Sequence, residues 1–170
     1  GLIVTNMRNV VLWGLYMVTF IFFVGLSAGG LIICSSVCVF GAERYRPLAR
    51  LGALLAAVCV VIAVMAVVAD MGRPDRVLNL FTNSQFQSPL IWDLIVISTY
   101  LAISLITLWF MCRADFVRRG SRLALGSKDL SEGAIERDYK MVKGIAFIAL
   151  PTAVLIHSVT AWIYGLQIAR

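Results

Sequence analysis

Charged side chains are scarce in this 170-residue sequence, and its longest apolar stretches contain none. Only 14% of the residues are charged, whereas 61% are hydrophobic and the mean hydropathy is +0.91. Soluble domains carry about 25% charged and roughly 45–50% apolar residues, so this composition calls for an apolar solvent. The sequence excludes an ordinary soluble domain and predicts an integral membrane protein.

The histidine and cysteine residues do not indicate a haem or metal centre. The sequence has a single histidine, whereas membrane b-type cytochromes usually hold haem between two. The four cysteines lie within or at the edges of apolar blocks, where we expect them to pack as small apolar residues. They are Cys34, Cys38, Cys59 and Cys112. We therefore expect no metal, haem or iron–sulfur cluster in this chain, so a redox role would need electrons from another subunit.

The net charge of +6 does not indicate a nucleic-acid partner. The basic residues lie between the hydrophobic blocks and form no stripe interleaved with stacking aromatic side chains. Such charge is typical of the loops that orient a membrane protein. We expect the lipid bilayer to be the partner, and no nucleic acid.

Four hydrophobic blocks are each long enough to cross a bilayer, which takes about 20 residues. We expect transmembrane helices over residues 10–41, 51–70, 89–112 and 143–168. A cytoplasmic loop over 113–142 is expected to contain an amphipathic helix, Glu132 to Lys143. Ser88 is the expected N-cap of the third helix, with Pro89 in its first turn. The fold class is all-α, a single membrane bundle over 1–170, and we expect it to belong to a longer chain.

The connecting segments predict the orientation. The connections after the first and third blocks are rich in Lys and Arg, whereas Arg73 and Arg76 in the second are balanced by Asp70 and Asp75. The positive-inside rule therefore places the first and third connections in the cytoplasm and the second on the periplasmic side. An interfacial belt of aromatic side chains is expected on that side. Its members are Trp13, Tyr16, Trp92, Trp162 and Tyr164.

Ionisable groups inside a bilayer are costly, so each is a candidate functional residue. His157 lies well inside the fourth block, Asp93 lies one turn into the third, and Asp70 and Arg73 end the second. A His and an Asp on neighbouring helices can bind and deprotonate a small redox carrier. The alternatives are structural. His157 is then a hydrogen-bonded interior histidine, Asp93 a charge favourable to a helix N-terminus, and Asp70 with Arg73 a clasp at a helix end. Tyr16 either lines a pocket or belongs to the belt.

The order of four motifs resembles the NrfD/PsrC family of polysulfide-reductase-like membrane subunits. The motifs are Gly25-Leu26-Ser27-Ala28-Gly29-Gly30, Asp70-Met71-Gly72-Arg73-Pro74-Asp75-Arg76, Ser88-Pro89-Leu90-Ile91-Trp92-Asp93, and His157-Ser158-Val159-Thr160-Ala161-Trp162 after Pro151. The second and fourth are the specific signals, because strings of small residues are frequent in membrane helices. Phe40-Gly41 and Tyr45 with Pro47 look more like the longer members, such as the membrane subunits of alternative complex III and of sulfite-reduction-associated complexes.

The resemblance implies a quinone-reactive anchor within a larger subunit of eight to ten helices. Such a subunit exchanges electrons between menaquinone or ubiquinone and a ferredoxin-like iron–sulfur subunit on the periplasmic side, with proton uptake or release. Molybdopterin or multihaem cytochrome subunits are the implied further partners, and the bacterial cytoplasmic (inner) membrane is the implied location. Carried over to this sequence, His157 is the expected hydrogen-bond partner of the quinone, and Asp93 is the expected proton acceptor on quinol oxidation. Asp70 and Arg73 match the mouth of the quinone pocket, and Tyr16 and Trp92 are added as candidate quinone contacts.

Two other functions are compatible with the same residues. In a proton or ion transporter, Asp93 and His157 would form an ion path without redox chemistry. In a structural anchor, the quinone site would have been lost and substitution of His157 would affect assembly alone.

Overall fold

Four long helices form the bundle in the part of the chain that the structure describes. The computed structural model describes residues 14–70, 86–120 and 129–166. Its helices are α2 (Leu15–Phe40), α3 (Arg46–Asp70), α5 (Pro89–Arg118) and α6 (Glu132–Leu166), with a 3-10 turn, η1 (Glu43–Tyr45), between α2 and α3. Each of the four is long and apolar enough to cross a membrane. The predicted all-α membrane bundle is confirmed.

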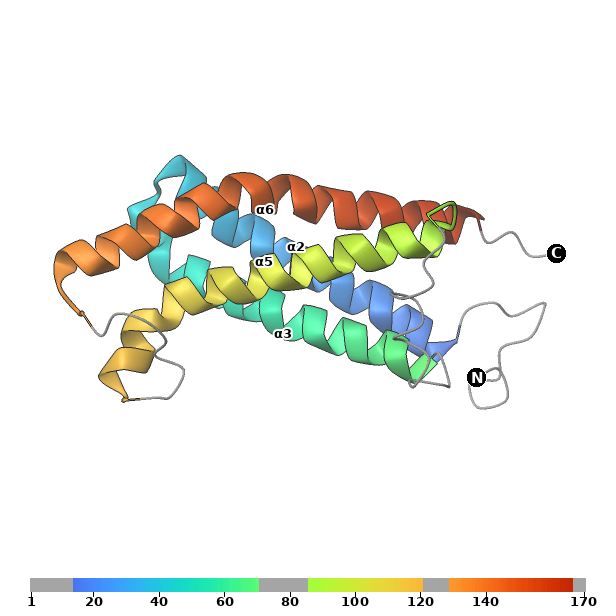
Figure 1. The fold of residues 1–170 in the computed structure, drawn as a ribbon, viewed down its shortest axis with the longest axis horizontal. Helices are drawn as coiled ribbons and strands as arrows, with labels where there is room; N and C mark the ends of the chain where they lie inside the picture. Colours follow the sequence, from blue (N-terminus) through green and yellow to red (C-terminus); the bar gives the residue numbers. More distant parts are fainter. Residues whose placement is uncertain (1–13, 71–85, 121–128, 167–170) are drawn as a thin grey trace.

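The helices form a closed ring in which α2 and α5 each pack against both α3 and α6. Figure 1 shows the start of α2, the end of α3, the start of α5 and the end of α6 at the same end of the bundle. We call this the acidic end, because Asp70 ends α3 and Asp93 lies in the first turns of α5. The opposite, basic end carries Arg46, Arg50 and Arg113.

Two helices extend further at the basic end than the sequence predicted. The third continues to Arg118 rather than ending near 112, and the fourth begins at Glu132 rather than near 143. The residues expected to form an amphipathic helix inside a loop are thus the first turns of α6. The physical reason is an ion pair between the Arg113 and Asp138 side chains, which are 4% and 13% exposed. This buried pair holds the last turns of α5 against the first turns of α6.

Local sequence signals set the other helix ends. Gly41 ends α2 in the left-handed conformation at φ +66°, which glycine adopts without a steric cost. The next helix, α3, begins at Arg46 rather than near 51, with Pro47 in its first turn. Proline is tolerated there because its missing N–H has no partner in the helix. Ser88 precedes Pro89 at the start of α5 as predicted, but its side chain makes no capping hydrogen bond.

The start of α6 is fixed by a short hydrogen-bonded turn. Ser131 Oγ accepts a hydrogen bond from the Ala134 N–H at 3.3 Å, as an N-cap side chain does. The carboxyl group of Asp129 accepts hydrogen bonds from the Ser131 N–H at 2.9 Å and the Ser131 hydroxyl at 3.0 Å. These hydrogen bonds favour the charged form and lower the pKa of Asp129.

Small residues bring the backbones of α2 and α3 together. A Cβ atom on Gly30 would lie 2.7 Å from the Gly52 carbonyl oxygen, and one on Gly52 would lie 2.7 Å from that of Gly30. No described atom of another helix lies within 4 Å of a Cβ placed on Gly29. The predicted small-residue string therefore includes the point of close approach, but Gly30 makes the contact rather than Gly29.

A hydrogen-bonded serine joins three helices beside this contact. The Ser27 hydroxyl of α2 donates to the carbonyl oxygen of Ala56 in α3 at 2.7 Å. Ser27 has only one hydroxyl hydrogen, so the Tyr100 hydroxyl of α5 donates in turn to Ser27 Oγ at 3.0 Å. Ser27, Ala56 and Tyr100 are fully buried. Lipid gives helices no hydrophobic driving force for association, so interhelical hydrogen bonds of this kind contribute to holding the bundle together.

Replacing Gly30 with Ala should destabilise the bundle by about 1–3 kcal/mol, because the added methyl group overlaps backbone rather than a movable side chain. Thermal unfolding of the full-length protein in detergent measures the loss. Gly29→Ala is the matched control, since it adds the same methyl group to the same helix in open space. Equal melting temperatures for the two variants would contradict the assigned contact.

Candidate functional site at the acidic end

Asp93 and Thr160 link α5 to α6 at the acidic end. The Thr160 hydroxyl donates a hydrogen bond to Asp93 Oδ1 at 3.0 Å. Thr160 is buried at 6% exposure, and Asp93 is half-buried. One carboxyl oxygen of Asp93 is thus held by a neighbouring helix within an otherwise apolar span.

Tyr164 lies one turn beyond Thr160 and joins α6 to α2. Its hydroxyl donates to the sulfur atom of Met17 at 3.2 Å. The same side chain interacts electrostatically with the carboxyl groups of both Asp93 and Asp70. The acidic end therefore carries a phenol and two carboxyl groups from three different helices that interact electrostatically, and we call this set the acidic cluster.

Asp70 contributes an unused acceptor to this cluster. Its Oδ1 atom is buried and has no hydrogen-bond partner in the described part of the chain. A buried acceptor without a partner costs free energy until a donor is supplied. The end of α3 is therefore prepared to accept a hydrogen bond.

His157 lies deeper in the bundle, on the same face of α6. The spacings of three and four residues from His157 to Thr160 and on to Tyr164 align these side chains over about 10 Å of the helix. His157 Nδ1 lies 3.3 Å from the Ala153 carbonyl oxygen of its own helix. On the other side of the ring, Nε2 lies 3.9 Å from the position of a Cβ atom on Gly25 in α2. His157 is exposed in the described bundle and lies at the edge of the α2–α6 contact.

The remaining predicted site residues lie outside this cluster or outside the described ranges. Tyr16 is 38% exposed, and Trp92 is 53% exposed with its indole N–H donating to the Phe86 carbonyl oxygen at 3.0 Å. Arg73 lies outside the described residues, so its predicted role at the pocket mouth stays a prediction. Trp92 and Trp162, which is 75% exposed, have the outward positions that an interfacial belt requires.

Sequence reasoning missed the roles of Thr160, Tyr164 and Met17. The sequence predicts Tyr164 in the aromatic belt, but its side chain is half-buried and its hydroxyl is hydrogen-bonded to Met17. Its helical register with His157 was the available signal, because residues seven apart lie on nearly the same helix face. No sequence pattern identifies Met17 as the partner, since that contact depends on how α2 and α6 pack.

The cysteines take packing positions. Cys34, Cys38 and Cys59 are buried, Cys112 is partly buried, and all four are free thiols. Among the described residues, no group of three or more His, Cys, Asp or Glu side chains is placed to hold a metal ion.

The fold and the acidic end define an integral membrane protein with polar groups near the ends of an otherwise apolar bundle. The chain belongs to the NrfD family: the model described as polysulphide reductase, NrfD, matches residues 3–170. This membership confirms the resemblance inferred from the four sequence motifs. No solved structure gives a significant match.

Three curated relatives are subunits of oxidoreductases. The chain is 45% identical over its whole length to a putative membrane subunit of dimethyl sulfoxide reductase from Halobacterium salinarum, of which it covers 39%. Over 93% of its length it is 27% identical to a subunit of selenate reductase from Mesobacillus selenatarsenatis, covering 41% of that protein. An Hdr-like menaquinol oxidoreductase integral membrane subunit of Archaeoglobus fulgidus is 24% identical over 94% of the chain, which covers 35% of it. The chain thus spans about two fifths of the length of these relatives.

Replacing Thr160 with Val should lower the stability of the full-length protein by about 0.6–1.5 kcal/mol, because Asp93 loses its interhelical donor. Thr152→Val is the matched control. Thr152 is also buried in α6, but its hydroxyl donates at 2.8 Å to the Ile148 carbonyl oxygen of the same helix. Thermal unfolding compares the two variants, and a control as unstable as Thr160→Val would refute the link between α5 and α6.

Proposed function

We propose that this chain carries the polar residues of a quinone site in the membrane subunit of a respiratory oxidoreductase complex. The complex exchanges electrons between the quinone pool, menaquinone or ubiquinone, and an iron–sulfur subunit. The observation that carries the proposal is the convergence of Asp70, Asp93 and Tyr164 at one bundle end, with His157 below them on the same helix face. The name of the Archaeoglobus relative, a menaquinol oxidoreductase subunit, supports the choice of ligand.

The donor and acceptor set at the acidic end fits a quinone headgroup. A quinol presents two hydroxyl donors, and Asp70 Oδ1 is a buried acceptor without a partner in the described part of the chain. A quinone presents two carbonyl acceptors, and the Tyr164 hydroxyl would donate to one of them by exchanging its hydrogen bond to Met17. When bound, the quinone supplies two-electron chemistry coupled to two protons.

His157 is arranged to accept a proton through Nε2. The Ala153 carbonyl oxygen can only accept a hydrogen bond, so its contact with Nδ1 requires the hydrogen to be on Nδ1. The neutral ring then keeps a lone pair on Nε2, the atom nearer α2. We infer that this atom binds the headgroup.

Asp93 is the proposed proton acceptor on quinol oxidation. Thr160 donates to Oδ1 and fixes the orientation of the carboxyl group, which leaves Oδ2 to take the proton. Asp70 is the last residue of α3, at the same end of the bundle. We infer that a proton leaving Asp93 exits at this end of the bundle, on the side of Asp70.

We place the acidic end on the outer, periplasmic side of the cell membrane. The support is the excess of Lys and Arg at the opposite end, including Arg46, Arg50 and Arg113. The ferredoxin-like iron–sulfur subunit would then dock on the outer side, and molybdopterin or multihaem cytochrome subunits would follow it. The relatives named as dimethyl sulfoxide reductase and selenate reductase subunits support a reductase complex of this kind.

Asp93→Asn in the intact complex should reduce the rate of quinol-dependent electron transfer by about 10²-fold, because an amide cannot accept the proton. His157→Gln should raise the KM for quinol, since it alters the proposed headgroup contact. Quinol oxidation by purified complex, followed spectrophotometrically across quinol concentrations, measures both effects.

Ser158→Ala is the matched control for His157. Ser158 is the next residue of α6, is exposed, and donates at 3.0 Å to the Val154 carbonyl oxygen of its own helix. Its kinetics should equal those of the unsubstituted complex. Unchanged quinol kinetics in both Asp93→Asn and His157→Gln would refute the site. Proton flux in the isolated subunit without quinol would favour a transporter instead.

A further inference from the structure

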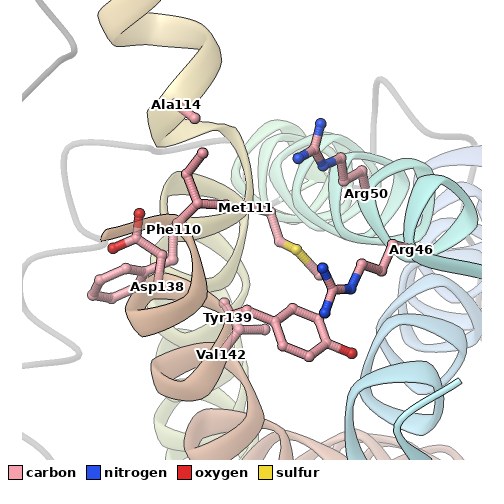
Figure 2. Close-up of a pocket in the computed structure, with 9 residues that line it drawn as sticks. Arg46, Arg50, Phe110, Met111, Ala114, Asp138, Tyr139 and Val142 are labelled. Carbon is pink, nitrogen blue, oxygen red and sulfur yellow. The ribbon is translucent and has the colours of Figure 1, made fainter. Parts of the chain in front are cut away.

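A second polar site lies at the basic end, where a small pocket opens between α3, α5 and α6. Its volume is about 50 Å³, several times the roughly 10–15 Å³ that one water molecule needs. The polar lining residues are Arg46, Arg50, Asp138 and Tyr139, and Met111 and Val142 contribute to the apolar wall. Figure 2 shows the two arginines on one side of the pocket and Asp138 on the other, with Tyr139 and Met111 between them.

The two arginines of this pocket have hydrogen-bonding capacity to spare. The Arg46 guanidinium lies 4.3 Å from the centre of the Tyr139 ring and donates from Nη2 to Glu43 at 2.7 Å. Its Nε atom is nevertheless buried without a hydrogen-bond partner in the described part of the chain. Arg50 Nη1 lies 3.6 Å from Asp115 Oδ2, which is too far for a good hydrogen bond.

The carboxyl groups nearby offset this positive charge only in part. Asp115, the partner of Arg50, has a side chain that is 46% exposed, so water screens their attraction. Asp138 is already paired with Arg113, a residue that does not line the pocket. The Glu43 side chain is 74% exposed, so water screens its attraction for Arg46. The Tyr139 hydroxyl is buried and makes no hydrogen bond of ordinary geometry to a described residue. The pocket thus offers two guanidinium groups and a phenol to an anion.

The position of the pocket indicates which anion binds. No charged residue follows Arg50 in α3 until Asp70, and none follows Lys143 in α6 up to Gly165. The apolar part of the span therefore begins at the level of the pocket. Lipid phosphates lie at this boundary, and basic pockets between membrane helices bind anionic headgroups.

We propose that the pocket binds the phosphate of an anionic phospholipid, with Arg46 and Arg50 as its charge partners and Tyr139 as a further donor. The apolar wall at Met111 and Val142 contacts the glycerol and upper acyl carbons. A free phosphate shares the headgroup chemistry but makes no use of this wall.

Native mass spectrometry of the delipidated full-length protein, titrated with dioleoyl phosphatidylglycerol, counts the bound lipid. The double variant Arg46→Gln, Arg50→Gln should bind phosphatidylglycerol about thirtyfold more weakly. Tyr139→Phe leaves both arginines and the aromatic wall in place and should weaken binding about fivefold. It keeps the proposal testable if the double variant does not fold.

Arg118→Gln, Arg119→Gln is the matched control. Both residues are exposed at the same end of the bundle, and the change in charge is the same. This variant should bind phosphatidylglycerol within about twofold of the unsubstituted protein. Equal losses in the control and pocket variants, or equal binding of dioleoyl phosphatidylcholine, would overturn the proposal. Full displacement of the lipid by inorganic phosphate alone would identify a free-anion site and overturn the lipid assignment.

Discussion

The contact between the backbones of Gly30 and Gly52 sets the geometry on which the rest of the bundle depends. In lipid, helices gain no hydrophobic free energy by associating, so close packing and interhelical hydrogen bonds must hold them. Because α2 and α3 touch here, the Ser27 hydroxyl reaches Ala56 on the next helix and accepts a hydrogen bond from Tyr100 on a third. These contacts fix α2, α3 and α5 to one another between the two ends of the bundle.

The two ends carry opposite chemistry. At the basic end, the buried Arg113 side chain is compensated by Asp138, as the cost of a buried charge requires. At the acidic end, the described carboxyl groups of Asp70 and Asp93 are accompanied by hydroxyl groups. Hydroxyl groups do not neutralise a carboxylate, but they both donate and accept hydrogen bonds and can therefore pass a proton on. This contrast explains why we assign proton chemistry to the acidic end and headgroup binding to the basic end.

Much of the fold could be predicted from the sequence, because four apolar blocks of membrane-spanning length permit little except a helical bundle. The limits of α5 and α6 could not be predicted, because charged residues beyond 112 are typical of a loop. Only the structure shows that Arg113 pairs with Asp138 and holds these turns together. The acidic site could also be predicted only in part. Asp93 and His157 stand out in the sequence because ionisable residues are rare inside a bilayer. The hydrogen bond of Tyr164 to Met17 depends on helix packing, which no local sequence pattern encodes.

The central claim is that the acidic end holds a quinone headgroup. A density map of the intact complex with a bound quinone analogue tests it most directly. The account predicts headgroup density between α2, α5 and α6, with an oxygen atom within hydrogen-bonding distance of His157 Nε2 or the Tyr164 hydroxyl and Asp93 beside it. A headgroup bound elsewhere, with none of His157, Asp93 and Tyr164 in reach, would contradict it.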